Sequence, residues 1–277
     1  MPELPEVETT RRALIPHLSN VTCTQVVVRQ AKLRLPFPAD LSTLLPGQAL
    51  DTIERRAKYL LLHFETGILI LHLGMSGSIK IIFSNEEPSK HEHYDLIFTS
   101  ADDKTIILRY RDPRRFGMVQ WWAHGLPMPT FLRTLGPEPL DDRFNGEWLW
   151  AQTRQSTSAI KPWLMDGHHV VGIGNIYAQE SLFRTAIHPA RAAQSLSKTE
   201  CRELVAQIKQ TLNAAIAAGG SSLRDFVHIG GEHGWFQQTY FVYGREGEPC
   251  RHCGAPIERM VQAQRATCYC PVCQPRY

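Results

Sequence analysis

Two pairs of cysteines near the C-terminus constrain the fold of this chain more than any other feature. Cys250 and Cys253 form one C-x2-C pair, Cys270 and Cys273 form a second, and sixteen residues separate the pairs. Each pair can place two thiolates on one tight turn, and two such turns complete a tetrahedral zinc site. Because protein fills all four positions, the predicted Zn2+ is structural and leaves no open coordination position for chemistry. We expect this one metal ion to hold the fold of residues 242–277, since so short a module has little core.

The other three cysteines are interpreted as apolar residues. The chain has seven cysteines, and its N-terminus lacks the basic and then apolar pattern of an export signal, so we expect a reduced, cytoplasmic setting without disulfides. Cys268 lies one strand step from Cys270 and could compete as a zinc ligand, but we interpret it as a small core residue. Cys23 and Cys201 are expected to be buried thiols.

The overall pattern predicts an α+β, multidomain chain. The 277 residues suffice for two domains, and no apolar run approaches the ~20 residues of a membrane span. Residues 1–18 follow a helical period. Short apolar runs separated by turn residues then predict an antiparallel β-sandwich. These runs are 25–28, 59–64, 67–73, 78–83, 94–98, 105–110 and 118–122.

Beyond the strands, the pattern becomes helical from about residue 141 to residue 226. Its clearest segment, 196–218, ends at Gly219 and Gly220. A stretch rich in Pro and Gly precedes the whole helical region and is typical of a linker. We therefore divide the chain into an N-terminal domain at 1–124, a linker at 125–139, a helical domain at 140–241 and the cysteine module at 242–277.

The first six residues can carry covalent chemistry. If Met1 is removed, Pro2 offers a secondary amine, which can attack the anomeric carbon of a sugar and collapse to an iminium. Glu3 and Glu6 lie beside it for acid and base work. A disordered tail is the alternative. Pro5, however, suits a first helical position, which favours an anchored terminus.

A glycine-rich turn at 172–174 leads into a predicted helix. Backbone N–H groups of such a turn can approach a phosphate at the positive end of the helix. A plain turn between helices is the alternative, although Lys161 supplies a nearby cation. The net charge of +3 is only mildly basic, so nucleic-acid binding must depend on where the charges lie.

Six blocks of sequence, together with the four cysteines, cover nearly the whole chain in order: 1–9, 56–61, 72–77, 112–117, 135–140 and 172–178. These blocks resemble the formamidopyrimidine-DNA glycosylase/endonuclease VIII family, in particular its bacterial 8-oxoguanine branch. It implies an N-terminal helix with an antiparallel β-sandwich, then a helix–two-turn–helix domain and a zinc β-hairpin. It also implies a monomeric bacterial repair enzyme, associated with the nucleoid, whose partner is duplex DNA containing an oxidised purine.

The resemblance assigns a glycosylase and an abasic-site lyase reaction to five residues. Pro2 would form a Schiff base with the sugar, Glu3 would assist protonation and Glu6 would hold the geometry of ring and amine. Lys58 would donate the proton of the first elimination, and Arg265 that of the second.

Further residues would contact the DNA or fill the space that the everted base leaves in the double helix. The matching DNA-contact positions are His72, His91, Arg114, Ser156, Lys161 and Asn175. Met75, Arg114 and Phe116 match an intercalation triad that replaces the everted base, whereas core packing is the alternative for Met75 and Phe116. The Ser156 segment is less basic than is usual in the family. Residues 221–240 match a loop that closes over the lesion.

Two other functions remain open at this point. An endonuclease VIII-like enzyme for oxidised pyrimidines is the nearer one, but Leu4 and the intercalation triad favour the purine branch. A lesion-binding protein without catalysis is the second, and the intact Pro2-Glu3 start argues against it.

Overall fold

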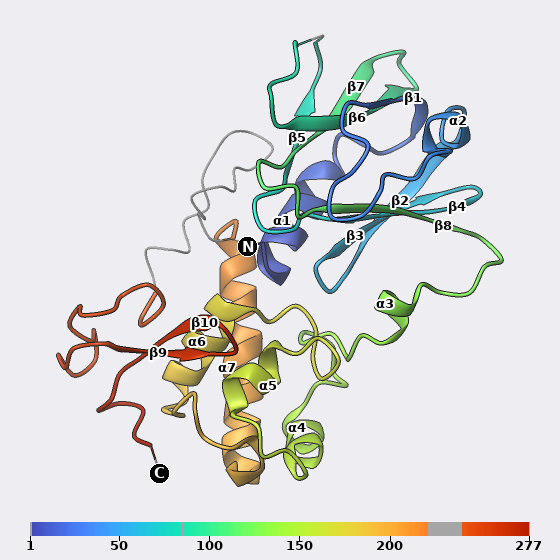
Figure 1. Ribbon diagram of the computed structural model, residues 1–277. Helices are drawn as coiled ribbons and strands as arrows, with labels where there is room; N and C mark the ends of the chain where they lie inside the picture. Colours follow the sequence, from blue (N-terminus) through green and yellow to red (C-terminus); the bar gives the residue numbers. More distant parts are fainter. Residues whose placement is uncertain (1, 85, 221–239, 277) are drawn as a thin grey trace. The chain divides into compact units, whose positions relative to one another are not determined.

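A computed structural model describes residues 2–84, 86–220 and 240–276, which divide into two compact units (Figure 1). The first unit contains residues up to Thr130 together with 218–220, and the second contains 131–217 and 240–276. None of the helices in the described residues combines the length and the apolar character that crossing a membrane requires.

The first unit is built on one antiparallel sheet with the order β5-β7-β6-β1-β2-β3-β4-β8. β1 and β2 share two residue pairs, Val21 with Leu50 and Thr22 with Ala49, so the sheet consists of two four-stranded halves joined at that point. This arrangement confirms the predicted antiparallel architecture. The strands are β1 (Val21–Val28), β2 (Ala49–Arg56), β3 (Tyr59–Phe64), β4 (Gly67–His72), β5 (Ser78–Ile82), β6 (Glu92–Ser100), β7 (Thr105–Arg111) and β8 (Met118–Ala123).

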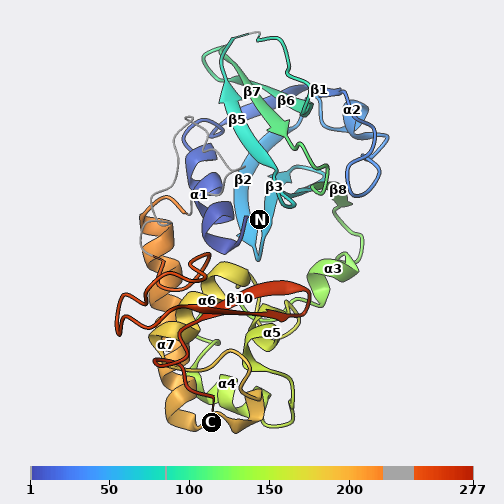
Figure 2. The ribbon, with the colours of Figure 1, turned by 60° about the vertical axis from the view of Figure 1, so that its left-hand side comes forward.

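The N-terminal helix α1 (Leu4–Leu14) packs against β2 and β3 (Figure 2). It is shorter than the predicted 1–18, although the Leu18 N–H still donates to the Leu14 carbonyl, at 3.0 Å, in the following turn. Val7 and Leu14 are fully buried and join the apolar core that both halves of the sheet enclose. Burial of this apolar face, more than helix propensity, fixes the N-terminus.

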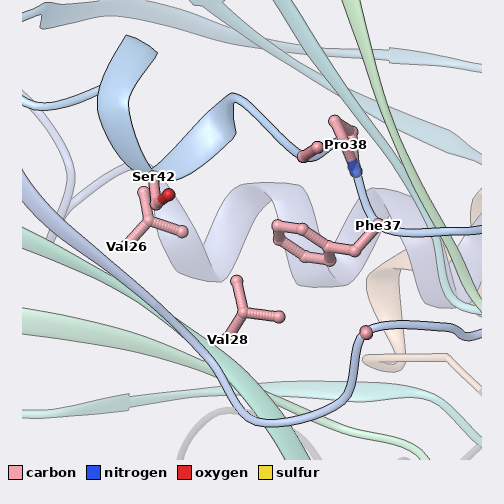
Figure 3. Close-up of a pocket in the computed structure, with 7 residues that line it drawn as sticks. Val26, Val28, Phe37, Pro38 and Ser42 are labelled. Carbon is pink, nitrogen blue, oxygen red and sulfur yellow. The ribbon is translucent and has the colours of Figure 1, made fainter.

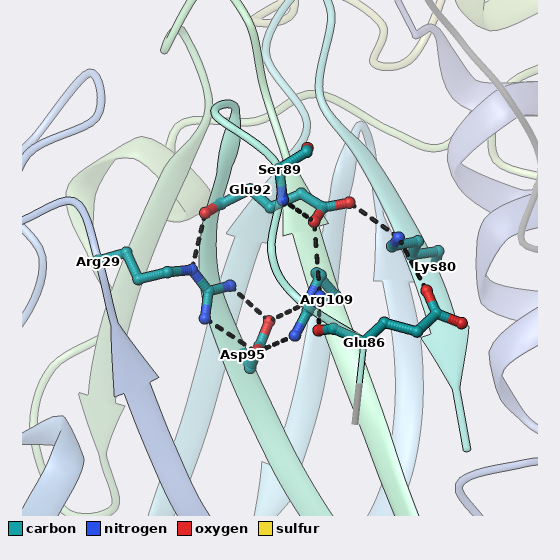
Figure 4. A network of polar contacts seen from close by, with 7 residues as sticks. All are labelled: Arg29, Lys80, Glu86, Ser89, Glu92, Asp95 and Arg109. Atoms are coloured by element: carbon teal, nitrogen blue, oxygen red, sulfur yellow. Dashed lines mark hydrogen bonds and ion pairs between the residues drawn. The ribbon is translucent and has the colours of Figure 1, made fainter. Parts of the chain in front are cut away.

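A buried ion network joins β6 and β7 to the end of β1 (Figure 4). Asp95 accepts two hydrogen bonds from Arg29, at 2.9 and 2.6 Å, and two from Arg109, at 2.8 Å each. Glu92 Oε1 forms an ion pair with Lys80 Nζ at 2.9 Å. Each buried charge has an opposite partner, which offsets the cost of removing it from water.

An apolar pocket of about 410 Å3 lies between β1 and the short helix α2 (Leu41–Leu44) (Figure 3). Val26, Val28 and Phe37 contribute side chains to its lining. The lining residues carry no ionisable side chain.

The second unit contains a long helix, α7 (Lys198–Ala217), close to the predicted segment. Ser197 and Glu200 form a capping box at its start, with hydrogen bonds of 3.2 and 2.8 Å. Gly219 and Gly220 end it at φ values of +77° and +84°, where an L-residue would be strained. The other elements are α3 (Thr130–Arg133), which begins at the boundary, α4 (Gly146–Thr153), α5 (Ile160–Met165), α6 (Asn175–Arg184), η1 (Ala193–Ser195), β9 (Glu258–Gln262) and β10 (Arg265–Tyr269).

Candidate functional site

Pro2 is buried directly before α1, next to two residues with carboxylate side chains. Glu3 is the N-cap of α1, and its backbone N–H donates to Glu6 Oε2 at 2.8 Å. The Glu3 side chain in turn accepts the backbone N–H of Glu6, which completes a capping box. Both carboxylates are buried, with Glu3 2% and Glu6 0% exposed. The local sequence therefore fixes Pro2 beside two acidic groups.

The segment directly after α7 lies close to the Glu6 carboxylate. A Cβ at Gly220 would lie 3.4 Å from Glu6 Oε1, an ordinary van der Waals distance, so Gly220 lies beside the Glu6 carboxylate. Both residues belong to the first unit. The sequence predicted Gly220 as a helix stop and did not predict this contact.

Lys58 and His72 lie at neighbouring strand ends of the first unit. Lys58 occupies the two-residue turn between β2 and β3, after Ala57 at φ +56°. His72 ends β4, where it pairs with Tyr59 and its ring lies 4.9 Å from the Tyr59 ring. The hairpin geometry thus brings two predicted site residues together.

His72 is held as a neutral hydrogen-bond donor. Its Nδ1 accepts the backbone N–H of Gly74 at 3.0 Å, so the ring proton is assigned to Nε2. Burial, together with the charges of Lys58 and Arg34, lowers the pKa of His72 to about 4. At neutral pH the ring can therefore donate through Nε2 without carrying charge.

Arg34 and Lys32 are basic residues of this region that the sequence analysis missed. Arg34 acts electrostatically on Tyr59 and His72, and its backbone N–H donates to the Gly117 carbonyl at 3.0 Å. Lys32 lines a cavity of about 320 Å3 together with Arg114. The run Arg29-Gln-Ala-Lys-Leu-Arg34 is the signal that could have indicated them.

The three residues of the predicted intercalation triad lie on two loops of the first unit that touch. The Arg114 guanidinium carbon lies 5.0 Å from the centre of the Phe116 ring, and Phe116 is 45% exposed. Met75 is half-buried on the other loop. A Cβ at Gly74 would lie 2.4 Å from the carbonyl carbon of Phe116, so the loops are in close contact. Phe116 is thus not a core side chain.

In the second unit, two predicted phosphate-binding residues contact strand β10. Lys161 is 1% exposed, and its Nζ donates to Thr267 Oγ1 at 2.6 Å. Asn175, the first residue of α6, donates through Nδ2 to the Ala266 carbonyl at 3.1 Å. Both side chains thereby support the strand that begins with Arg265.

Arg265 directly follows a tight turn. Ala263 and Gln264 have φ values of +46° and +60°, which is typical of the two-residue turn that best suits a twisted hairpin. Arg265 pairs with Gln262 across the hairpin, and its side chain is exposed. The backbone of Arg265 is therefore fixed while its guanidinium is available to a ligand.

Ser156 lies in the loop after α4 and is half-buried. Its carbonyl accepts the Gln194 N–H at 3.0 Å. Arg154 lies over the Trp150 ring at 5.0 Å and donates to the Leu196 carbonyl at 2.6 Å. This arginine therefore makes its contacts within the second unit.

The four predicted zinc ligands form one cluster. The Sγ atoms of Cys250, Cys253, Cys270 and Cys273 all lie within 4.8 Å of one another, and those of Cys253 and Cys270 are 3.4 Å apart. Tetrahedral ligation with Zn–S bonds of about 2.3 Å places the sulfurs about 3.8 Å apart. The donor set fits one structural Zn2+.

Cys268 lies outside this four-cysteine cluster. It is 5% exposed and packs with Phe183, Val242 and Ile257. Its backbone N–H donates to Gln179 Oε1 at 2.6 Å. The interpretation of Cys268 as a small core residue is confirmed. The loop expected to close over a lesion, at 221–240, lies outside the described residues except for Tyr240.

Three family models match consecutive parts of the chain. They are the formamidopyrimidine-DNA glycosylase N-terminal domain at 1–119, the formamidopyrimidine-DNA glycosylase H2TH domain at 135–227, and the zinc finger found in FPG and IleRS at 247–276. Together the matched ranges contain α1 and strands β1 to β7 of the first unit, α4 to α7 of the second, and the cysteine cluster.

Relatives and solved structures agree over the full length. The formamidopyrimidine-DNA glycosylase of Methylobacillus flagellatus is 53% identical over 274 residues, covering 99% of this chain and 96% of the relative. The crystal structure of the MutM (Fpg) protein of Thermus thermophilus is 38% identical, with a TM-score of 0.86 and complete coverage of both chains. The Lactococcus lactis Fpg, solved in complex with DNA containing an abasic site, is 34% identical, with a TM-score of 0.90 over 99% of this chain and 100% of that one. The chain therefore belongs to the formamidopyrimidine-DNA glycosylase family.

Proposed function

We propose that Pro2 supplies the nucleophilic amine of the reaction that this chain catalyses. The chain is a base-excision-repair DNA glycosylase that removes oxidised purines from duplex DNA and also cleaves the strand as an abasic-site lyase. The observation that carries the proposal is the capping box of Glu3 and Glu6, which fixes Pro2 beside two buried carboxylates.

The glycosylase step requires that Met1 be removed. The Pro2 nitrogen attacks C1′ of the damaged nucleoside, the bond from C1′ to the base breaks, and the departing base takes a proton. Glu3 assists this proton transfer and the opening of the sugar ring. The Glu6 carboxylate holds Glu3 in position by accepting the Glu3 backbone N–H. The C1′–O4′ bond then breaks, O4′ takes up a proton as the Pro2 nitrogen loses one, and the nitrogen forms an iminium with C1′, which is the Schiff base needed for strand cleavage.

Strand cleavage follows by two eliminations. Loss of a C2′ proton from the iminium expels the 3′ phosphate, and a second elimination expels the 5′ phosphate, which leaves a gap of one nucleoside. Lys58 donates the proton of the first elimination and Arg265 that of the second. The exposure of Arg265 on a fixed hairpin supports this role.

Contacts to the DNA backbone come from residues of both units. In the first unit, His72 donates through Nε2, His91 and Arg114 also contact the strand, and the newly recognised Arg34 and Lys32 add positive charge. In the second unit, Asn175 and the loop at Ser156 contribute. A phosphate contact by Lys161 stays a prediction. In this structure the Lys161 ammonium is buried and donates to Thr267.

Eversion of the damaged base uses the touching loops of the first unit. Met75 and Phe116 act as wedges in the base stack, and Arg114 hydrogen-bonds the cytosine left without a partner. The exposure of Phe116 and its contact with Arg114 support this assignment.

The proposal also includes a structural zinc ion, the domain bounds and the place of the enzyme in the cell. Cys250, Cys253, Cys270 and Cys273 hold one Zn2+, which stabilises the hairpin that carries Arg265 and takes no part in the chemistry. We assign the domains as 1–124, 125–139, 140–241 and 242–277. We propose that the enzyme acts as a monomer in the bacterial cytoplasm, on the DNA of the nucleoid.

Strand-cleavage assays on two duplexes test the proposed substrate. The first contains 8-oxoguanine opposite cytosine and the second contains thymine glycol. Wild-type protein should cleave the first duplex faster and leave phosphate at both ends of the gap. Glu3→Gln should lose excision of 8-oxoguanine, while Glu65→Gln, an exposed carboxylate in the turn after β3, should cleave like wild type. Preference for thymine glycol would instead favour an endonuclease VIII-like enzyme.

A further inference from the structure

Asp112 directly follows β7 and has no exposed surface, and its carboxylate accepts four hydrogen bonds. Its Oδ1 accepts the Ser76 hydroxyl at 2.7 Å and the Arg114 N–H at 3.3 Å. Its Oδ2 accepts the Gly117 N–H at 2.8 Å and the Tyr110 hydroxyl at 3.2 Å. One buried carboxylate therefore joins the loop that carries Met75 to the loop at 114–117.

The backbone of Asp112 makes a third connection. Its N–H donates to the His91 carbonyl at 2.9 Å, and its carbonyl oxygen lies 2.7 Å from His93 Nε2. The same carbonyl accepts the Arg115 N–H at 3.2 Å. The three segments that carry the proposed DNA contacts of Met75, His91 and Arg114 thus meet at one residue.

Steric packing leaves these loops little freedom. A Cβ at Gly117 would lie 1.7 Å from the Tyr110 hydroxyl oxygen, and one at Gly77 would lie 2.4 Å from the same atom. Arg115 has a φ of +55°, which is strained for an arginine and persists because its surroundings hold it. A densely packed, fully bonded network of this kind favours one arrangement over several.

The hydroxyl of Ser76 has a central place in this network. It donates to Asp112, and it also accepts the Arg114 backbone N–H at 3.3 Å. Ser76 is 1% exposed and directly follows Met75. Loss of this one oxygen would loosen the Met75 loop from the Arg114 loop without substituting any of the proposed DNA-contacting side chains.

We propose that Asp112, Ser76 and Tyr110, here called the Asp112 clamp, are positioning residues for base eversion. By fixing Met75 relative to Arg114 and Phe116, the clamp sets how well the enzyme fills the stack and distinguishes the base opposite the lesion. The inference rests on the proposed function, since it assumes that these three side chains enter the DNA helix. Catalysis depends steeply on such placement, because a misplacement of 1 Å can cost about a hundredfold in rate.

Ser76→Ala tests the clamp by removing the hydroxyl alone. Single-turnover excision of 8-oxoguanine is measured opposite cytosine and opposite adenine, beside cleavage of a preformed abasic site opposite cytosine. We expect excision opposite cytosine to fall about tenfold and the cytosine-to-adenine rate ratio to fall by a similar factor. Cleavage of the abasic site, which has no damaged base to unstack, should change less.

Asp95→Asn is the matched control. It removes a buried carboxylate from the same sheet, in the Arg29–Arg109 network, without a contact to either loop that Asp112 joins. It should lower Tm and leave the cytosine-to-adenine ratio unchanged. Asp112→Asn serves as a second variant, and if it fails to fold, Ser76→Ala carries the test alone.

The outcomes separate the two claims. A folded Ser76→Ala protein with a wild-type ratio, or with equal losses on all three substrates, would overturn the clamp while leaving the enzyme's function intact. A wild-type protein that neither excises 8-oxoguanine nor cleaves the abasic site would overturn the proposed function, and the clamp with it.

Discussion

The ammonium of Lys161 donates a hydrogen bond of 2.6 Å to Thr267 Oγ1, two residues along β10 from Arg265. Lys161 is 1% exposed and Thr267 is fully buried. A buried ammonium needs its acceptors, because its transfer out of water is costly. This contact therefore fastens the hairpin that carries Arg265 to α5.

Thr267→Val should loosen that hairpin. Valine keeps the shape of threonine but cannot accept the Lys161 hydrogen bond, so we expect the free energy of unfolding to fall by about 2 kcal/mol. The proportion of fully eliminated product should fall as well, because Arg265 is proposed to act in the second elimination. Gel analysis of the cleavage products and chemical denaturation measure the two effects.

Thr185→Val is the control for this change. The Thr185 hydroxyl donates to the Ser181 carbonyl at 3.1 Å, at the end of α6. It should leave the product pattern unaltered. If Thr267→Val kept both the wild-type pattern of cleavage products and the wild-type midpoint of chemical denaturation, the Lys161 contact would not support Arg265.

Loss of zinc should unfold the cysteine module. Cys273→Ser removes one thiolate of the tetrahedral set, and a module with so small a core depends on its metal. We expect less than one zinc per chain by elemental analysis, together with a lower Tm and loss of binding to an abasic-site duplex. Cys268→Ala, outside the cluster, should retain one zinc. Zinc loss in Cys268→Ala would contradict the ligand assignment.

Acid should destabilise the first unit through Glu8. Burial alone would raise the pKa of Glu8, but hydrogen bonds from Arg11 and Arg12 outweigh it and lower the pKa from 4.5 to about 2. Because the folded pKa is depressed, the stabilisation is present above pH 4.5 and is lost as the pH falls towards 2. Glu8→Gln should lower stability at pH 7 by about 2 kcal/mol and flatten its decline in acid. Urea unfolding at pH 7, 4.5 and 3 checks both effects, and a decline as steep as that of wild type would contradict the assignment.

Substitution of Gly74 should disturb the wedge loops. Gly74 has a φ of +66°, and a Cβ there would lie 2.4 Å from the Phe116 backbone. Gly74→Ala should therefore destabilise the protein by about 2 kcal/mol or more through both strain and overlap. Gly125→Ala, at φ +82° with no atom within 4 Å of the added Cβ, separates strain from overlap and should cost about 1 kcal/mol. Equal losses of Tm in the two variants would show that the loops do not pack as described.

Local sequence patterns predicted those parts of the molecule that depend on neighbouring residues. The strand runs were predicted from apolar spacing, whereas β2 was missed because it is largely polar, with Leu50 and Ile53 as its buried residues. The spacing of the cysteines likewise predicted a cluster that the fold closes. Such signals lie within a few residues of one another.

Contacts between distant residues could not be predicted in this way. Lys161 and Thr267 are 106 positions apart, and Ser76 and Asp112 are 36 apart. A lysine beside a glycine-rich turn is typical of a phosphate ligand, and its burial against a strand depends on the folded hairpin. The role of Asp112 likewise depends on three chain segments that meet only after folding.

Borohydride trapping on a duplex with 8-oxoguanine opposite cytosine shows whether Pro2 is the nucleophile. Wild-type protein is compared with Pro2→Gly, after intact mass has shown that Met1 is absent and elemental analysis has shown one zinc per chain. We expect a covalent protein–DNA adduct that peptide mapping places on Pro2, and a greatly reduced adduct in Pro2→Gly. An absent adduct in wild-type protein, or one that maps to a lysine, would contradict this role of Pro2.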